Sequence, residues 1–539
     1  MKKENKTSRR DFLKQSMAVG AGVVAMTSVA GCNPKTSAAD IQWDKETDLI
    51  VVGSGTVAVA ALTAAKAGAK VIILEKGLAF GGTTALSGGG FWVPNNQSMQ
   101  KQGIEDNRED AIKYLKIVTG EQSSDEMIES YVDNAPKMSQ FLSDSFGWEF
   151  GTSAGKAYAD YYDMKEGSRP YGRTIYMYQD GSQVGAQIMY GVFKATLEEM
   201  GVEILLETPG KKLITNDAGE VIGIIAELDG EDIAIKANKG VILGTGGFDF
   251  NKEMTHHFLR GPIYVSNSVS TNTGDGHIMG MELGADLRNM NESWGLPAFL
   301  LDEETLKGEV DWQMYRGKPG AIVVNKHGER IGNEASSYEL FQRSFYNWDS
   351  GMAEWRNIPS FFIADRGYTD NYFLPGSGYQ VGVVPDWMAQ ADNLEELCEK
   401  LGIDWAGLQA TLEVFNVNAA EGIDPIWHRG DFPFDVNTAG DMTGRTDLKN
   451  NCLAPIENGP FVGAAYYPGT CGTNGGLRIN QNGQVLHVRG NPIPRLYAVG
   501  NTSGSVMGAA YPGGGSTLGA GFTYGWLAAN HAISQELAS

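Results

Sequence analysis

The sequence predicts an α/β fold that is interrupted by an inserted α+β domain. Runs of buried-strand residues end in glycine turns at 48–53, 240–247 and 496–500, and a helical pattern follows the first of them. From about residue 291 to 464 tryptophan and tyrosine become frequent, and glycine turns no longer follow buried strands. The strand and glycine pattern then returns. We therefore expect one discontinuous domain that is built around an insertion.

The composition limits the class of protein. The 539 residues are 42% hydrophobic and 20% charged, which is typical of a globular protein with two sizeable domains. The net charge of −22 argues against a nucleic-acid partner, since phosphate binding requires a basic face. The four cysteines (Cys32, Cys398, Cys452 and Cys471) show no CxxC spacing, so we predict no metal site.

The first 32 residues predict an export signal. Residues 8–14 (SRRDFLK) form a twin-arginine pattern, and the apolar run at 17–31 is shorter than the roughly 20 residues of a spanning helix. The run ends in a motif that resembles a bacterial lipoprotein box with Cys32 as the lipidated residue; the alternative is a chance cysteine near an ordinary cleavage site. We expect residues 33–44 to form a polar tether. The expected location is the periplasm or cell envelope, with a membrane tether through lipidated Cys32.

A strand, a glycine turn, a helix, a second strand and an acid follow in this order. The strand at 48–52 leads into GSGTVA at 53–58, a small-residue helix occupies 59–67, and the strand at 70–76 contains Glu75 near its end. Such a turn lets a pyrophosphate approach the helix N-terminus, and the acid binds a ribose hydroxyl. A chance glycine turn is the alternative, but the full pattern favours dinucleotide binding. The predicted contacts are Gly53, Ser54, Gly55, Thr56, Val57, Ala58, Glu75 and Lys76.

A second glycine-rich loop, GGTTALSGGG at 81–90, follows the acid. A nicotinamide enzyme normally continues into an ordinary helix here, whereas flavoproteins of the fumarate-reductase type carry such a loop. With FWVPNN at 91–96, the chain resembles the 3-ketosteroid Δ1-dehydrogenases of that superfamily. The resemblance implies FAD, held by a Rossmann-like FAD-binding domain at 45–290 and 465–539 with an inserted α+β substrate (cap) domain at 291–464. It implies further FAD contacts at Gly81, Gly82, Thr83, Thr84, Ser87, Gly88, Gly89, Gly246, Gly247, Asp275, Gly500, Asn501, Gly515, Thr517 and Leu518.

The YPGGG loop (511–515) precedes a helical pattern at about 516–531. Proline and repeated glycine disfavour a strand or a helix interior at this place. Backbone N–H groups at the start of the helix are free to bind a carbonyl oxygen, and the Tyr511 hydroxyl is a second donor. Together they predict an oxyanion hole. The alternative is a glycine-rich loop that packs on a cofactor, with Tyr511 in the core.

The resemblance assigns roles to four residues. In the family, FAD takes hydride from C1 of a 3-oxosteroid and a base removes a proton from C2, which leaves a C1–C2 double bond. By position, the Tyr511 hydroxyl and the Gly515 N–H hold the C3 carbonyl oxygen. Tyr338 is the base and Tyr161 supports it, while the aromatic insertion suits a small apolar, steroid-like ketone. Two nearby tyrosines stay open as alternatives to Tyr161: Tyr158 and Tyr162.

Two positions depart from the fumarate reductases. Those enzymes have a histidine in the segment 470–476, where this chain has Asn474. They also use an arginine as the acid after an Asn-Glu pair, which stands at 333–334 here; Arg343 is nearby, but Tyr338 fits the steroid pattern better. Dicarboxylate reduction is therefore disfavoured. The export signal raises one rival function, an exported reductase that saturates an enone, and a second, a non-enzymatic flavin electron-transfer or binding lipoprotein. We expect a separate quinone or cytochrome to exchange electrons with the flavin.

Overall fold

The computed structural model describes residues 41–153 and 158–538. From Gln42 onward the chain forms one compact unit. The twin-arginine segment, Cys32 and most of the predicted tether at 33–44 lie outside the described residues. Within the described ranges, no helix has the length and apolar character needed to cross a membrane.

A parallel sheet forms the core of the predicted α/β domain. β1 (Lys45–Val52) pairs in parallel with β2 (Val71–Leu74) on one side and with β10 (Glu231–Leu243) on the other. The sheet continues in parallel from β2 to β7 (Glu203–Leu205) and from β10 to β23 (Pro492–Ala498). All four residues of β2 are apolar and buried, as expected of a central parallel strand. The predicted α/β fold is confirmed.

Antiparallel strands extend this sheet. β8 (Gly210–Thr215) pairs with β9 (Val221–Leu228), which pairs with the first part of β10. Asp229 and Gly230 form the two-residue turn between β9 and β10, with φ angles of 53° and 83°. Two positive φ angles are what a tight hairpin of this kind requires. The alternation at 216–235 predicts this hairpin, and β22 (Gln484–Leu486) adds a further antiparallel strand beside β23.

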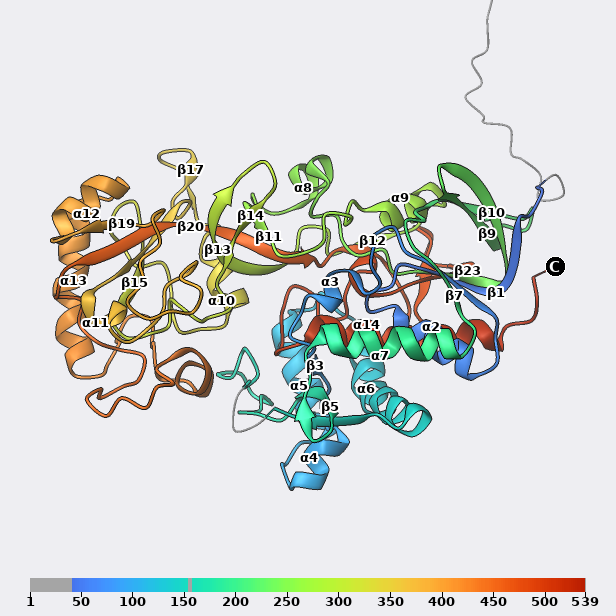
Figure 1. Ribbon diagram of the computed structural model, residues 1–539, viewed down its shortest axis with the longest axis horizontal. Helices are drawn as coiled ribbons and strands as arrows, with labels where there is room; N and C mark the ends of the chain where they lie inside the picture. The colour runs from blue at the N-terminus through green and yellow to red at the C-terminus, as the bar shows by residue number, and fades with distance from the viewer. Residues whose placement is uncertain (1–40, 154–157, 539) are drawn as a thin grey trace, which may run out of the picture. The chain divides into compact units, whose positions relative to one another are not determined.

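Two helices from opposite ends of the chain pack against each other. α2 (Ala58–Lys66), which connects β1 to β2, contacts α14 (Ser516–Ser534), and α14 also contacts α6 (Asp125–Phe146) (Figure 1). Small residues allow the close approach, because a Cβ at Gly521 of α14 would lie 2.5 Å from the Thr56 side chain. Other helices of the described residues are α3 (Gly82–Ala85), α4 (Gln97–Gln102), α5 (Arg108–Thr119), α7 (Ala186–Glu199), α8 (Lys252–Phe258), α9 (Asp275–Glu282), α11 (Arg366–Thr369), α12 (Leu394–Leu401) and α13 (Trp405–Ala420).

A second, mainly antiparallel sheet is built around the long strand β20 (Phe461–Thr473). β13 (Ser293–Asp302) and β18 (Ser360–Ala364) pair with its two halves, and helix α10 (Tyr338–Arg343) packs on β13. The sheet also contains β11 (Val265–Ser266), β14 (Lys307–Val310), β15 (Ala321–Asn325) and β19 (Ala389–Ala391). Its strands lie on both sides of residues 291 and 464, and the domain boundaries at these residues stay a prediction.

A small antiparallel sheet lies at the start of α14. β5 (Thr174–Gln179) pairs with β3 (Phe91–Trp92) and with β4 (Glu149–Thr152). The Trp92 N–H donates to the Gly515 carbonyl oxygen at 3.1 Å. This sheet therefore holds the end of the YPGGG loop. Further short strands are β6 (Ser182–Gln183), β12 (Leu287–Arg288), β16 (Trp348–Asp349), β17 (Glu354–Trp355) and β21 (Gly476–Leu477).

Candidate active site

A cavity of about 380 Å³ lies at the carboxyl ends of the parallel strands. Val52, Leu74 and Gly244 line it at or just after the ends of β1, β2 and β10. The chain proceeds from β1 to β2 on one side and returns to β10 on the other, so this is the point where open α/β sheets bind ligands. The same cavity extends to Trp312 and Tyr338. It therefore reaches beyond the residues of the dinucleotide-binding turn.

The turn after β1 requires glycine at position 53. The φ angle of Gly53 is 100°, which is strained for any residue with a side chain. A Cβ at this position would also lie 2.1 Å from the Gly244 carbonyl oxygen. The absence of a side chain thus lets the ends of β1 and β10 stay close while the backbone faces the cavity.

Four helices that begin at this cavity have no capping side chain. They are α2, α3, α9 and α14. A fifth helix, α10, begins at the cavity residue Tyr338 and is capped by Ser337. Asn107 and Ser124 cap α5 and α6, which begin elsewhere. Uncapped N–H groups at helix starts bind anions and carbonyl oxygens. This set of donors fits the phosphates and ring carbonyl groups of FAD.

The acid after β2 ties the two glycine loops together. The Ser54 hydroxyl donates to Glu75 at 2.5 Å, and the Gly81 N–H donates to the Ser54 hydroxyl at 2.7 Å. Lys76 donates to Asp275 at 2.9 Å. Among the cavity residues that the structure describes, Lys76 is the one cation. The carboxylate of Glu75 is the group that we expect to bind a ribose hydroxyl here.

Most predicted cofactor residues line the cavity. These are Gly53, Ser54, Gly55, Thr56, Glu75, Lys76, Gly82, Thr83, Thr84, Ser87, Gly88, Gly89, Gly246, Asp275, Asn501, Gly515, Thr517 and Leu518. Five others do not line it: Val57, Ala58, Gly81, Gly247 and Gly500. Val57 and Ala58 are fully buried. Ala58 is the last position of the GSGTVA motif at 53–58. This position serves the packing of the helix on the sheet, so no ligand contact is needed there.

Sequence reasoning missed a segment that covers the second glycine loop. The Val269 N–H and the Asn272 amide donate to the Thr83 hydroxyl at 3.1 and 3.2 Å. The one sequence signal nearby is the TGDG turn at 273–276, since the segment itself has neither motif nor periodicity. The missed lining residues include Asn267, Val269, Thr271, Asn272, Tyr176, Trp312, Gln313 and Cys471.

Three predicted catalytic tyrosines meet in the cavity. The ring centroids of Tyr161 and Tyr338 are 5.2 Å apart, those of Tyr161 and Tyr511 are 5.4 Å apart, and those of Tyr338 and Tyr511 are 5.5 Å apart. Trp294 packs edge-on against Tyr511 at 5.1 Å, and Trp312 against Tyr338 at 5.0 Å. Three segments that are distant in the sequence thus form one aromatic site.

Burial keeps these three phenols protonated. Each side chain is at most 5% exposed. Loss of water raises the pKa of Tyr161 and of Tyr338 well above the ordinary value. Burial also raises the pKa of Tyr511, to about 12, although hydrogen bonds from Thr517, Tyr338 and the Gly515 N–H oppose the shift. The site therefore offers phenol O–H donors at neutral pH.

Gly515 brings a backbone donor next to the Tyr511 hydroxyl. Its φ angle is 83°, and a Cβ there would lie 2.2 Å from the Gly90 carbonyl oxygen. The Gly515 N–H is close enough to the Tyr511 hydroxyl to lower the pKa of this phenol. The two donors predicted for the oxyanion hole therefore lie together at the start of α14.

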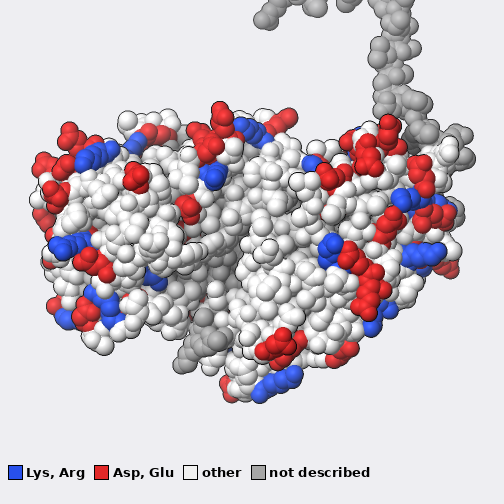
Figure 2. All heavy atoms as spheres, in the orientation of Figure 1, with Lys and Arg blue, Asp and Glu red and all other residues white. Residues whose placement is uncertain are grey.

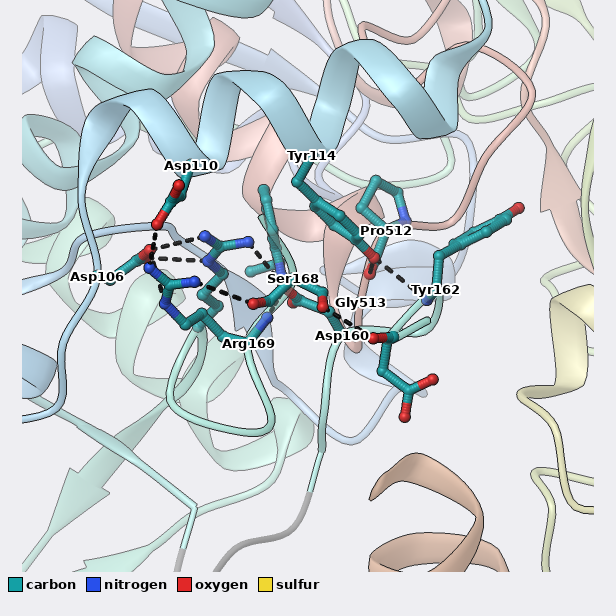
Figure 3. A network of polar contacts seen from close by, with 12 residues as sticks. Asp106, Asp110, Tyr114, Asp160, Tyr162, Ser168, Arg169, Pro512 and Gly513 are labelled. Atoms are coloured by element: carbon teal, nitrogen blue, oxygen red, sulfur yellow. Dashed lines mark hydrogen bonds and ion pairs between the residues drawn. The ribbon is translucent and has the colours of Figure 1, made fainter. Parts of the chain in front are cut away.

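Buried polar groups hold the Tyr161 segment against the YPGGG loop. The Tyr161 N–H donates to the Pro512 carbonyl oxygen at 2.9 Å. The Tyr114 hydroxyl donates to the same oxygen at 2.5 Å, and Figure 3 shows Tyr114 beside Pro512 and Tyr162.

Asp160 accepts a hydrogen bond from Arg173 at 2.7 Å, and both side chains are almost fully buried. Loss of either partner would leave a buried charge without its counter-charge, so this pair fixes the backbone around Tyr161. The hydrogen bond from Tyr161 to Pro512 connects this segment to the YPGGG loop.

A second set of hydrogen bonds lies behind the tyrosines. The Tyr162 hydroxyl donates to Glu339 at 2.8 Å, next to Tyr338 in the chain. Arg343 donates to Glu339 at 2.5 Å and to the carbonyl oxygen of Ala509. These bonds connect all three segments that carry the cavity tyrosines. Tyr162 does not line the cavity, in contrast to its neighbour Tyr161.

The positions that distinguish the fumarate reductases do not face the cavity. Arg343 is bound as just described and does not line it. Asn474 donates to the Gly508 carbonyl oxygen at 2.6 Å and does not line it either. Neither side chain is therefore placed to meet a substrate carboxylate. Tyr158 does line the cavity, but its ring packs on Tyr176 at 6.1 Å.

Comparison with known proteins agrees with this site. The FAD binding domain family matches residues 48–518. A 3-oxosteroid 1-dehydrogenase from Mycolicibacterium smegmatis is 33% identical over 90% of this chain and 97% of that protein. A 4-oxocyclohexanecarboxylate 2-dehydrogenase from Sinomonas cyclohexanicum is 31% identical over 89% of this chain and 92% of that protein.

A solved structure is similar over most of the chain. The 3-ketosteroid delta1-dehydrogenase from Sterolibacterium denitrificans, in complex with 1,4-androstadiene-3,17-dione, has a TM-score of 0.83 at 30% identity. The match covers 91% of this chain and 100% of that one. The predicted resemblance and the FAD cofactor are thereby confirmed. The chain belongs to the 3-oxosteroid 1-dehydrogenase family of FAD-dependent flavoproteins.

Proposed function

We propose that this protein is an FAD-dependent oxidoreductase that forms or reduces the C1–C2 double bond next to the C3 ketone of a 3-oxosteroid. The observation that carries the proposal is the meeting of Tyr161, Tyr338 and Tyr511 in a cavity that also contains the glycine turns and uncapped helix starts. The steroid class is supported by the relative that holds 1,4-androstadiene-3,17-dione.

FAD would be held by the turn after β1, by Glu75 and by the loop at 81–90. When bound, FAD supplies the hydride acceptor or donor for the reaction. The neighbouring tryptophans Trp294 and Trp312 enclose the tyrosines. They exclude water, which strengthens every polar interaction in the site.

Residues of the chain bind the ketone oxygen and transfer the proton of the neighbouring carbon. The Tyr511 hydroxyl and the Gly515 N–H bind the ketone oxygen, which gains negative charge when the neighbouring carbon loses its proton. Tyr338 accepts this proton as the phenolate in the direction of dehydrogenation, and donates it as the phenol in the direction of reduction. Tyr161, whose ring centroid lies 5.2 Å from that of Tyr338, holds Tyr338 in position. One pair of groups thus binds the oxygen, and Tyr338 transfers the proton.

One observation favours a second candidate, an exported reductase that saturates an enone. Because burial raises the pKa of Tyr338 well above its ordinary value, the phenol proton is present at neutral pH. Reduction uses this proton directly, whereas dehydrogenation requires the phenolate. The twin-arginine pattern at 8–14 is also unusual for an intracellular steroid-degrading enzyme.

We also propose a location and partners. The protein is exported by the twin-arginine route, acts in the periplasm or cell envelope, and is tethered through lipidated Cys32. A separate quinone or cytochrome exchanges electrons with it. On the face drawn in Figure 2, Lys and Arg are interspersed with Asp and Glu, a pattern that does not suit nucleic acid. Fractionation tests this: replacing Arg9 and Arg10 by lysine should block export, and Cys32→Ala should release the protein from membranes.

The function is tested with the purified holoprotein. Bleaching of the flavin by 4-androstene-3,17-dione, and turnover with an artificial electron acceptor, support the dehydrogenase. Turnover of 1,4-androstadiene-3,17-dione with a reduced dye, and none in the other direction, supports the reductase. Turnover with fumarate and with no ketone would overturn both. A flavin that reacts with none of these compounds would leave the electron-transfer lipoprotein.

A further inference from the structure

The turn at 430–439 packs against Tyr161. Phe434 in this turn is 1% exposed, and its ring lies edge-on to the Tyr161 ring, with the centroids 5.1 Å apart. A short π-helix (Asp435–Ala439) follows Phe434 directly. π-Helical turns are rare in proteins and are frequent at functional sites. The aromatic site therefore has a neighbour that no sequence motif marks.

Asp163 holds this turn on the side of Tyr161. It lies two residues after Tyr161 in the chain, and its Oδ2 accepts a hydrogen bond from the Phe434 N–H at 2.6 Å. The ring and the peptide group of Phe434 thus both contact the segment that carries Tyr161. A displacement of Phe434 would break both contacts.

Asp435 holds the same turn on the side of Tyr338. It is 2% exposed, and its Oδ2 accepts hydrogen bonds from the Asn333 amide and from the Gly430 N–H, each at 2.9 Å. The Asn333 carbonyl oxygen accepts from the Ser336 hydroxyl at 2.8 Å, two residues before Tyr338. The turn therefore connects the segments of two cavity tyrosines.

The two carboxyl groups titrate near neutral pH. Burial raises the pKa of Asp163 to about 6 and the pKa of Asp435 to about 7. The charge of Asp160 also raises the pKa of Asp163, and the charge of Asp163 that of Asp435, whereas Arg429 opposes the second shift. The Cys452 thiol, which donates to the Asp435 carbonyl oxygen, stays protonated because burial raises its pKa to about 12.

The direction of the pH effect follows from these shifts. Both pKa values in the folded protein exceed the value of about 3.9 for an unfolded aspartate. The folded protein therefore binds the two protons more tightly, and the resulting stability is complete below about pH 4. It is lost as the pH rises through about 6 and about 7. Two carboxylates then flank the Phe434 peptide group, so the turn is held less firmly.

We propose that Phe434 is a positioning residue that keeps Tyr161 against Tyr338, and that Asp163 and Asp435 make its hold weaker at neutral than at acidic pH. The inference rests on the proposed function, to which it adds a regulation of the same site by pH. Phe434 acts through Tyr161, because it does not line the cavity.

Phe434→Leu tests the positioning with the holoprotein. In this variant kcat should fall roughly threefold to tenfold, the scale of one aromatic pair, while KM and flavin content stay unchanged. Phe415→Leu is the matched control, since Phe415 is buried on α13 and does not line the cavity. It should keep the wild-type kcat.

The double variant Asp163→Asn/Asp435→Asn tests the pH dependence. An amide oxygen can accept the same hydrogen bonds, because those of each carboxyl group go to Oδ2, but an amide does not titrate. The ratio of its kcat to that of the wild type should be near one at about pH 5 and rise to roughly threefold at about pH 8, within the range of one hydrogen bond. Its advantage in unfolding temperature should widen over the same range. Asp404→Asn, at the exposed cap of α13, should follow the wild type.

A kcat ratio or a difference in unfolding temperature that stays constant between about pH 5 and about pH 8 would overturn the inference. The same holds if Phe434→Leu keeps the kcat of Phe415→Leu, or if it loses FAD, since the ring would then serve cofactor binding. If the wild type turns over no steroid in either direction, the proposed function is refuted instead. The unfolding temperatures need no substrate and still test the two carboxyl groups.

Discussion

The two parts of the cavity are lined by different kinds of groups. The cofactor part is mostly backbone, formed by the turn at Gly53 and the uncapped starts of helices such as α2. The tyrosine part consists of side chains, which Tyr161, Tyr338 and Tyr511 contribute from separate segments. A site that is formed by backbone loses its ligand when an added side-chain atom fills it. A site that is formed by side chains loses activity when one hydroxyl oxygen is removed. The two parts can therefore be broken separately.

Adding one methyl group at Gly53 should have the largest effect, a loss of bound flavin. The new Cβ would lie 2.1 Å from the Gly244 carbonyl oxygen. Gly68→Ala is the matched control, because Gly68 also has a positive φ angle but no atom within 4 Å of the added Cβ. The flavin absorbance of the purified variants checks this. Full flavin content in Gly53→Ala would show that the turn does not hold the cofactor.

Tyr338→Phe should leave flavin binding intact and lower turnover by roughly a thousandfold, the scale of general acid–base catalysis. The variant removes one oxygen from the cavity and keeps the ring packing. Tyr346→Phe is the control, since that hydroxyl donates to Pro262 and Tyr346 does not line the cavity. Steady-state kinetics with a steroid and an artificial acceptor measures both. Near-normal turnover in Tyr338→Phe would remove it as the proton-transfer group.

Tyr511→Phe should cost about a hundredfold in kcat, because one of two oxyanion donors is lost. The smaller loss reflects the Gly515 N–H, which stays in place next to the altered ring. The same kinetic assay and the same flavin spectrum report it. A change confined to KM would mean that Tyr511 binds the ground state and the transition state equally.

The contrast between the two parts also explains what the sequence can predict. A backbone site leaves a local pattern: the helix expected at 59–67 is α2 (Ala58–Lys66), and the one expected at about 516–531 is α14 (Ser516–Ser534). A site that is formed by side chains from distant segments leaves no local pattern in the sequence. Only the family resemblance selects Tyr161 and Tyr338, because no spacing rule connects residues so far apart.

The residues that escaped prediction depend on tertiary packing alone. Asn272 reaches the second glycine loop only because the chain folds back onto Thr83. Gln313 is an ordinary polar residue in the sequence, and only the fold shows its buried amide oxygen without a partner. No periodicity or motif marks either position.

The pH dependence should separate the two directions of the reaction. Burial raises the pKa of Tyr338 well above its ordinary value, so the phenolate fraction grows about tenfold per pH unit between about pH 7 and about pH 9. The rate of flavin reduction by a saturated ketone should rise accordingly. Reduction of the dienone uses the phenol and should stay flat over this range. A plateau in the first profile near neutral pH would contradict a buried tyrosine base, and Tyr338→Phe should abolish the slope.

Tyr162→Phe should have the smallest effect, a loss of a few-fold in kcat with unchanged flavin content. It removes the hydrogen bond to Glu339 behind the tyrosines, and Arg343 still holds Glu339 in place. Because Tyr162 does not line the cavity, KM should change little. Tyr178→Phe, whose hydroxyl donates to Thr152 outside the cavity, is the control. If Tyr162→Phe were as damaging as Tyr338→Phe, the residue that supports the base would be Tyr162, and the ring contacts of Tyr161 would be packing only.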